Sequence, residues 1–122
     1  MPTLSRPWHV LAVHNVAISS EWYQQKLGFE EFLNMGNDWR FVRRDGIAIM
    51  LGQCPDEISA SENGNHSYFA YWHVDDASAL FVEWQANGVE MLKNVRDEEW
   101  GMREFALRTI DGHRIMVGQN LE

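Results

Sequence analysis

The chain has 122 residues, which suffices for one domain with a buried core and is too short for two ordinary domains. Its 18 acidic and 10 basic residues give a net charge of -8, which disfavours a nucleic-acid partner and would attract a cationic ligand. The single cysteine, Cys54, excludes an internal disulfide, and no apolar run is long enough to span a membrane. We therefore expect a soluble, cytoplasmic domain.

The first half of the chain predicts a strand, a helix and three further strands. Residues 10–14 form a short apolar run typical of a strand, and Asn15 is a favourable cap for a helix that extends to about Leu27. Gly28 supplies the left-handed position that often follows a helix. Two strands are then expected at residues 29–35 and 39–43, and a third within residues 45–53, after an Asp-Gly turn.

The second half predicts the same order of elements. Residues 68–74 form the strand, Asp75 or Asp76 caps the helix, and Gly88 ends it. The expected buried side of this helix consists of Ala77, Leu80, Phe81 and Trp84, spaced as one helical stripe. Two strands follow at residues 89–95 and 103–109, and a third within residues 111–119, after an Asp-Gly turn.

A short internal repeat supports two equivalent halves. Asp45–Gln53 and Asp111–Gln119 are identical at six of nine positions, 66 residues apart, and each begins with a tight Asp-Gly turn. We therefore predict an α+β domain over residues 1–122, with two pseudo-symmetric βαβββ modules whose sheets curl into half-open barrels. The modules span about 7–53 and 67–119, and the polar segment 54–66 links them as an exposed loop.

Local sequences along the chain resemble a known superfamily. Val13–Val16, Trp22–Tyr23 and Lys26–Glu30 are similar to the first strand, helix and Leu-Gly-Phe turn of the vicinal oxygen chelate superfamily, which includes glyoxalase I, extradiol dioxygenases and bleomycin-resistance proteins. The run Glu99–Arg108, which contains the sequence WGMREFALR, resembles the bleomycin-resistance branch in particular. The resemblance covers nearly the whole chain, and it implies a homodimer.

The resemblance also implies four pseudo-symmetric positions at which catalytic branches hold a divalent metal. In this chain those positions are occupied by Trp8, Met50, Phe69 and Met116. None of them offers an imidazole or a hard oxygen ligand, so we expect no metal, no cofactor and no catalytic residue. His9 lies beside the first position, and strand alternation turns it to the opposite face.

Aromatic side chains dominate the expected binding cleft. Trp100 follows the acidic run Asp97–Glu99 in a polar turn, where a tryptophan is more typical of a ligand platform than of a core. Glu99 and its acidic neighbours would then pair a cationic ligand. Trp39, between Asp38 and Arg40, is a second candidate platform. Four further candidate ligand contacts fall on the cleft side: Trp8, Met50, Phe69 and Met116.

Further candidates come from strand alternation. His73 shares a predicted face with Phe69 and Tyr71 and could bond a ligand. Arg40 and Arg108 fall on the predicted cleft face and could bind a carboxylate or amide. The alternative is that they pair with Glu104 and Asp38 inside the protein.

Three functions remain open on these observations. The first is a non-enzymatic protein that sequesters an aromatic, cationic natural-product antibiotic of the bleomycin type. The second is a metal-dependent lyase, isomerase or dioxygenase with an unusual ligand set, drawn from His9, His73, Glu104 and His113. The third is a structural or regulatory domain without a small ligand.

Overall fold

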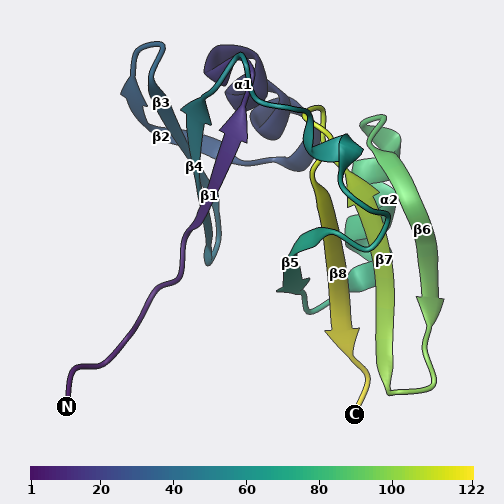
Figure 1. The fold of residues 1–122 in the computed structure, drawn as a ribbon. Coiled ribbons are helices and arrows are strands. Elements are labelled where there is room, and N and C mark those ends of the chain that lie inside the picture. Colours follow the sequence, from purple (N-terminus) through teal and green to yellow (C-terminus); the bar gives the residue numbers. More distant parts are fainter. The chain divides into compact units, whose positions relative to one another are not determined.

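The computed structural model describes residues 1–122 and contains two similar modules, each with one helix and one four-stranded sheet (Figure 1). The chain divides into two units, Met1–Glu57 and Ile58–Glu122. Unit 1 contains β1 (His9–Val13), α1 (Val16–Leu27), β2 (Glu30–Met35), β3 (Trp39–Arg44) and β4 (Ile47–Gln53). Unit 2 contains a short 3-10 turn η1 (Ala60–Glu62), β5 (Tyr68–His73), α2 (Ala77–Ala86), β6 (Glu90–Asp97), β7 (Met102–Arg108) and β8 (Arg114–Asn120). The predicted α+β fold of two βαβββ modules is confirmed.

The two sheets have the same topology. The strand orders are β1-β4-β3-β2 and β5-β8-β7-β6, and neither sheet closes into a barrel. In each sheet the first strand runs parallel to the last strand, because the helix carries the chain across between them, and the other neighbours are antiparallel. Gly52 and Gly118, at matching positions of the repeat, therefore lie beside the first strand of their respective sheets.

Each helix is capped by two side chains, one of which belongs to the repeat. Asn15 and Asp76 accept a hydrogen bond at 3.0 Å from the backbone amide three residues later. Gln53 and Gln119, the last residues of the two repeats, accept from the amide of the first residue of the helix at 3.1 and 2.9 Å. Each C-terminal strand thus fixes the start of its own helix, and Gly28 ends α1 at φ 75° as predicted.

The core of each unit lies between the sheet and its helix. On β1, Leu11 and Val13 are buried against α1, whereas the alternate residues point to the opposite face. Trp72 and Trp84 are buried in unit 2, and the burial of Trp84 was predicted. In unit 1 the buried aromatic residue of α1 is Tyr23, and the neighbouring Trp22 is half-buried. We call the face of each sheet opposite its own helix the helix-free face.

The segment expected as an open loop is partly ordered. It contains the turn η1, which packs on the Asp-Gly turn before β8. A Cβ atom at Gly112 would lie 2.6 Å from the backbone nitrogen of Ser61, and Gly112 has φ +88°, so both space and conformation require glycine. No helix of the chain has the length and apolar character needed to cross a membrane.

Candidate functional site

The helix-free face of the first sheet carries a cluster of partly exposed aromatic rings. Trp8, which directly precedes β1, is 43% exposed. Its ring makes edge-to-face contacts with Phe32 at 5.7 Å and Phe41 at 6.1 Å between ring centroids. Met50 is paired with Phe41 on the neighbouring strand, and Trp39 lies 6.4 Å from the same ring. The structure therefore brings Trp8, Met50 and Trp39 to one face.

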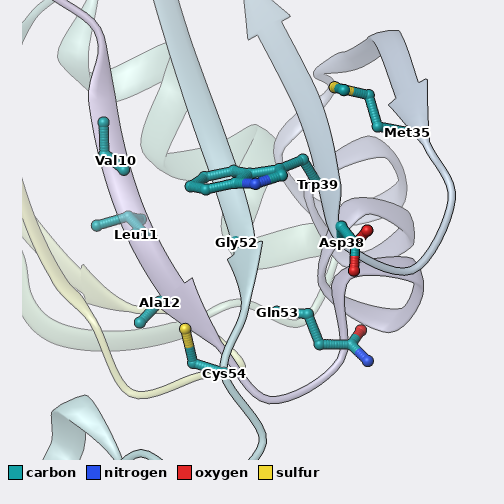
Figure 2. A pocket seen from close by; sticks show the side chains of 9 residues that line it. All are labelled: Val10, Leu11, Ala12, Met35, Asp38, Trp39, Gly52, Gln53 and Cys54. Carbon is teal, nitrogen blue, oxygen red and sulfur yellow. The ribbon is translucent and has the colours of Figure 1, made fainter.

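A pocket of about 530 Å³ opens at the end of this face, within unit 1 (Figure 2). It is lined by Val10, Leu11, Ala12, Met35, Asp38, Trp39, Gly52, Gln53 and Cys54. The Trp39 ring lies flat across Gly52, and a Cβ atom there would be only 2.9 Å from the ring. Position 52 must therefore be glycine for the Trp39 ring to pack flat against the sheet.

The pocket combines apolar walls with few polar groups, which is typical of small-molecule sites. Trp39 offers an aromatic surface, and the exposed Asp38 places a carboxylate at the rim. This arrangement suits a flat or cationic group that stacks on the indole.

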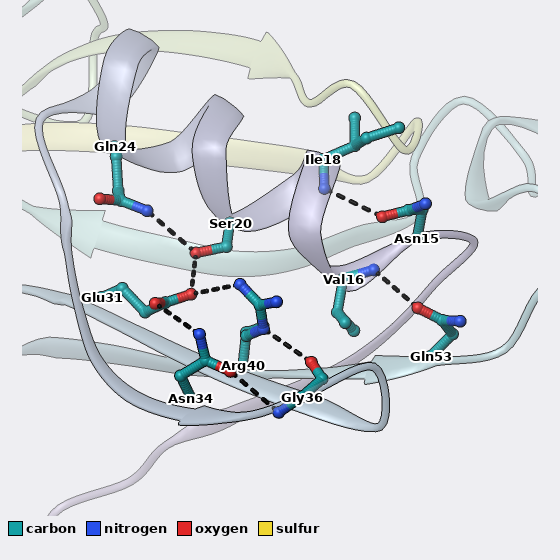
Figure 3. A network of polar contacts seen from close by, with 10 residues as sticks. All are labelled: Asn15, Val16, Ile18, Ser20, Gln24, Glu31, Asn34, Gly36, Arg40 and Gln53. Atoms are coloured by element: carbon teal, nitrogen blue, oxygen red, sulfur yellow. Dashed lines mark hydrogen bonds and ion pairs between the residues drawn. The ribbon is translucent and has the colours of Figure 1, made fainter.

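Arg40 does not reach this pocket, and its expected place on the cleft face is wrong. It lies two residues before the buried Val42 on β3, so both side chains are on the same face of the sheet, the face that is covered by α1. Its Nη1 lies 3.1 Å from Oε1 of Glu31, and its Nε donates to the carbonyl of Gly36 at 2.7 Å. Ser20 of α1 donates to the same Glu31 oxygen (Figure 3). Arg40 therefore ties the β2–β3 hairpin to the helix, through Glu31 rather than the expected Asp38.

The helix-free face of the second sheet is built around a buried carboxylate. Glu104 is 3% exposed, and its Oε2 accepts hydrogen bonds from the Tyr71 hydroxyl at 2.6 Å and from Trp100 Nε1 at 3.1 Å. Lys93 Nζ lies 3.0 Å from its other oxygen. Burial alone would raise the pKa of Glu104, but the bonds from Tyr71, Trp100 and Lys93 outweigh it and hold the pKa below its usual value.

Trp100 is held on this carboxylate while most of its ring stays accessible. It lies in the turn between β6 and β7 and is 59% exposed. One end of the indole is fixed by the bond to Glu104, and Lys93 Nζ lies 5.9 Å from the ring centre. An exposed aromatic ring with a fixed orientation loses little entropy on binding, so this geometry suits a stacking platform.

The acidic run beside Trp100 is largely neutralised inside the protein. Asp97 pairs with Arg103 at 2.6 Å, and Glu98 lies 2.6 Å from both Lys93 and Arg96. These bonds hold the pKa of Asp97 and of Glu98 below the usual range. Of the three acidic residues, the exposed Glu99 alone has no salt bridge, so the run does not form the expected three-charge surface for a cation.

The other predicted residues are distributed over this sheet. His73 lies next to Tyr71 on the helix-free face, with ring centres 5.2 Å apart. Phe69 does not lie on the cleft side, where it was expected, because a β-bulge between Tyr68 and Ala70 interrupts the alternation of side chains on β5. Its ring contacts Trp72 and His113 instead.

Met116 and Arg108 do lie on the helix-free face of the second sheet. Met116 is paired with Tyr71 on one side and Ala106 on the other. Arg108 forms an ion pair with Glu90 at 3.2 Å, a partner that the sequence did not indicate.

The residues at the expected metal positions do not fit a divalent metal. They are two aromatic rings and two thioethers, and no group of three His, Cys, Asp or Glu side chains converges anywhere in the chain. Of the alternative ligands, Glu104 is engaged within the protein, because both of its oxygens accept hydrogen bonds from protein donors.

Sequence reasoning missed the anchor of Trp100. Glu104, Tyr71 and Lys93 come from three strands, and only the paired register brings them together. One signal was available. Gly118 of the repeat predicts a close approach, and the Tyr71 hydroxyl indeed lies where a Cβ atom at Gly118 would be.

The comparisons with known proteins agree with this fold. The family model described as the Glyoxalase/Bleomycin resistance protein/Dioxygenase superfamily matches residues 6–117. No curated protein matches the chain.

Several solved structures are similar over nearly their full length. The bleomycin-binding protein from bleomycin-producing Streptomyces verticillus, complexed with copper(II)-bleomycin, has 25% identity and a TM-score of 0.73, covering 100% of this chain and 99% of that one. TioX from Micromonospora sp. ML1 has 21% identity and a TM-score of 0.74, covering 95% and 96%. UcmS2 has 18% identity and a TM-score of 0.77, covering 97% and 98%.

Proposed function

Because the chain belongs to the glyoxalase/bleomycin resistance protein/dioxygenase superfamily, we propose that it is a non-enzymatic protein that binds and sequesters a small aromatic molecule. The observation that carries the proposal is Trp100, whose ring is exposed while its indole nitrogen is fixed by the buried Glu104. A side chain held in this way serves recognition, because the structure has already ordered it before a ligand arrives. The positions that would hold a metal in catalytic relatives carry two aromatic rings and two thioethers in this chain. These side chains support binding rather than catalysis.

The pocket at Trp39 supports the same function in the first sheet. Its apolar lining and the indole over Gly52 suit a flat ring, and Asp38 would attract a cationic substituent. The similarity to a bleomycin-binding protein supports a natural-product antibiotic of that type as the ligand. We therefore propose Trp100 and Trp39 as the two aromatic platforms, with Trp8, Met50, Met116 and His73 on the surrounding surfaces.

We further propose that the protein acts as a homodimer. The helix-free face of the first sheet exposes Val10 at 61% and Met35 at 55%, beside the partly exposed Trp8. An apolar face of this kind on a small protein is typical of an interaction surface. A second copy that covers part of it would also deepen the pocket at Trp39, which would enclose a ligand more completely.

A fluorescence titration tests the binding function. A bleomycin-type glycopeptide and a small panel of planar cationic antibiotics are added to the purified protein, and tryptophan emission is followed. We expect at least one compound to change the emission saturably. Trp100→Ala should weaken its binding about tenfold or more, since loss of one stacked ring costs on the order of 1 kcal/mol or more.

Trp22→Ala is the matched control, because Trp22 is half-buried on α1 and packs edge-to-face on Tyr23. It should leave affinity unchanged, as measured by calorimetry, which does not depend on which tryptophan reports. Absence of any binding across the panel would contradict the drug-binding function. Equal affinity of Trp100→Ala and the unmodified protein would contradict the placement of the site.

A further inference from the structure

The two sheets carry a matching row of side chains that differs at one position. In the first sheet, Ala48 on β4 faces Arg43 on β3, which in turn faces Glu30 on β2. Arg43 and Glu30 form an ion pair at 2.8 Å, so this row is neutral. The row lies on the helix-free face, where the Arg43 guanidinium stacks on the Phe32 ring at 4.7 Å.

The second sheet repeats this row with an additional arginine. Arg114 on β8 faces Arg108 on β7, which faces Glu90 on β6. Arg108 pairs with Glu90 as Arg43 pairs with Glu30, and Arg114 stands at the repeat position of Ala48. Two guanidinium groups and one carboxylate leave this row with one positive charge in excess.

Arg114 is buried without a carboxylate partner. It is 3% exposed, and its Nη2 donates only to the backbone carbonyl of Ser61, at 3.3 Å. The ion pairs of unit 2 use Lys93, Arg96, Arg103 and Arg108, and Arg114 is in none of them. A buried charge without a counter-charge is costly, so this site is incomplete as the protein stands alone.

The two arginines with unsatisfied donors lie directly opposite each other on β7 and β8. Arg114 Nη1 and Arg108 Nε are buried nitrogen atoms without a hydrogen-bond acceptor. Residues directly opposite on antiparallel strands have Cβ atoms roughly 5 Å apart and project from the same face, so both guanidinium groups can reach one ligand. Arg108 retains 29% side-chain exposure, which gives a small ion access.

We propose that Arg108 and Arg114 form a binding site for one small oxyanion, a carboxylate, sulfate or phosphate group. The planar guanidinium presents pairs of N–H donors that match two oxygens of such a group. One negative charge would neutralise the row and satisfy both buried donors. The proposed oxyanion site uses neither Trp39 nor Trp100, so either proposal can fail alone.

Calorimetric titrations with inorganic phosphate, sulfate and benzoate test the site, each at constant ionic strength maintained with sodium chloride. We expect saturable binding of at least one of them to the unmodified protein. Preference for benzoate would identify a carboxylate site, and preference for phosphate or sulfate a site for tetrahedral anions. Arg114→Ala should reduce the affinity at least tenfold. This variant gives the second sheet the same row of alanine, arginine and glutamate that the first sheet already has with Ala48.

Arg43→Ala is the matched control, since it removes one arginine from the equivalent row of the first sheet and should leave oxyanion affinity unchanged. Arg108→Met provides a second test should Arg114→Ala not fold, and it should also weaken binding. Absence of oxyanion binding to the unmodified protein would overturn the proposal. So would binding that Arg114→Ala and Arg108→Met leave intact, or that Arg43→Ala reduces equally.

Discussion

At the scale of single residues, Glu104 is the side chain on which the candidate site depends. It orders Trp100, Tyr71 and Lys93 at once, from a position with almost no solvent contact. A buried carboxylate is stable in this setting only because three donors compensate for its lost hydration. In the proposed site, the side chain that would face a ligand, Trp100, and the side chain that positions it, Glu104, are therefore different residues.

Glu104→Gln should lower the free energy of unfolding by about 2 kcal/mol or more at neutral pH, because it removes charge-assisted bonds to buried donors. The pKa of Glu104 is lower in the folded protein than in the unfolded chain, so the unfolded chain binds more protons in acid. The stabilisation by Glu104 is therefore present above the ordinary carboxyl pKa. It is lost as the pH falls through the pKa that Glu104 has in the folded protein. Denaturant titrations between neutral and acidic pH should show a shallower pH dependence for Glu104→Gln. An unchanged slope would contradict this role.

The close contact between Tyr71 and Gly118 makes a second prediction at this scale. Gly118→Ala places a Cβ atom on the Tyr71 hydroxyl and should destabilise the protein by about 1–3 kcal/mol, through displacement of Tyr71 from Glu104. The same substitution in a Tyr71→Ala background should cost less. Thermal denaturation of the four proteins of this cycle measures the coupling, and additive effects would show that the contact is not the cause.

At the scale of elements, the repeat builds helix starts as well as strands. Gln53 and Gln119 end their strands, and each accepts from the first amide of its own helix. Gln53→Met and Gln119→Met keep the size of the side chain and remove the acceptor. Each should cost about 1 kcal/mol, the usual value of a helix cap, in urea denaturation. Asn34, which accepts a hydrogen bond from Gly36 in an exposed turn, offers a control site where Asn34→Met should cost less.

The element scale also shows what could be predicted from the sequence. The order of strands and helices, the cap Asn15 and the glycine after α1 all followed from local patterns, because each depends on a few neighbouring residues. The second cap was narrowed to Asp75 or Asp76, and it is Asp76. The faces of Arg40 and Phe69 did not follow from local patterns. For Arg40, the prediction required knowing which of the two alternating sets of side chains on β3 points toward α1. For Phe69, the bulge is a feature of strand pairing that no local pattern reveals.

The same distinction applies to the candidate site. Trp100 was predicted as exposed because charged neighbours surround it in the sequence, and it is exposed. Its anchor, and the internal pairing of Asp97 and Glu98, require strands distant in sequence to lie in one register. One copy of the repeat has Ala48 where the other has Arg114, so this departure from symmetry can be seen in the sequence. The burial of Arg114 cannot be seen there.

At the scale of the whole molecule, the proposal of a binding protein predicts independence from metal. Elemental analysis after gentle purification should find no stoichiometric divalent metal, because Trp8, Met50, Phe69 and Met116 cannot complete a coordination sphere. Chelator treatment should leave ligand affinity unchanged. One metal per chain, held by a histidine, would contradict the non-enzymatic function.

The proposed dimer makes the last prediction, which concerns how the protein covers the apolar residues exposed on the helix-free face of its first sheet. Light scattering at micromolar concentration should report about twice the chain mass of 14.2 kDa. Val10→Lys should shift the protein to the monomer, since a charge on an apolar interface must be desolvated when the second copy binds. Val82→Lys is the control, because Val82 is equally exposed, at 62% against 61%, but lies on α2 rather than on the helix-free face. A dimer that Val82→Lys disrupts and Val10→Lys preserves would move the interface away from β1. A strict monomer would remove the dimer altogether, and the pocket at Trp39 would then have to bind its ligand within a single chain.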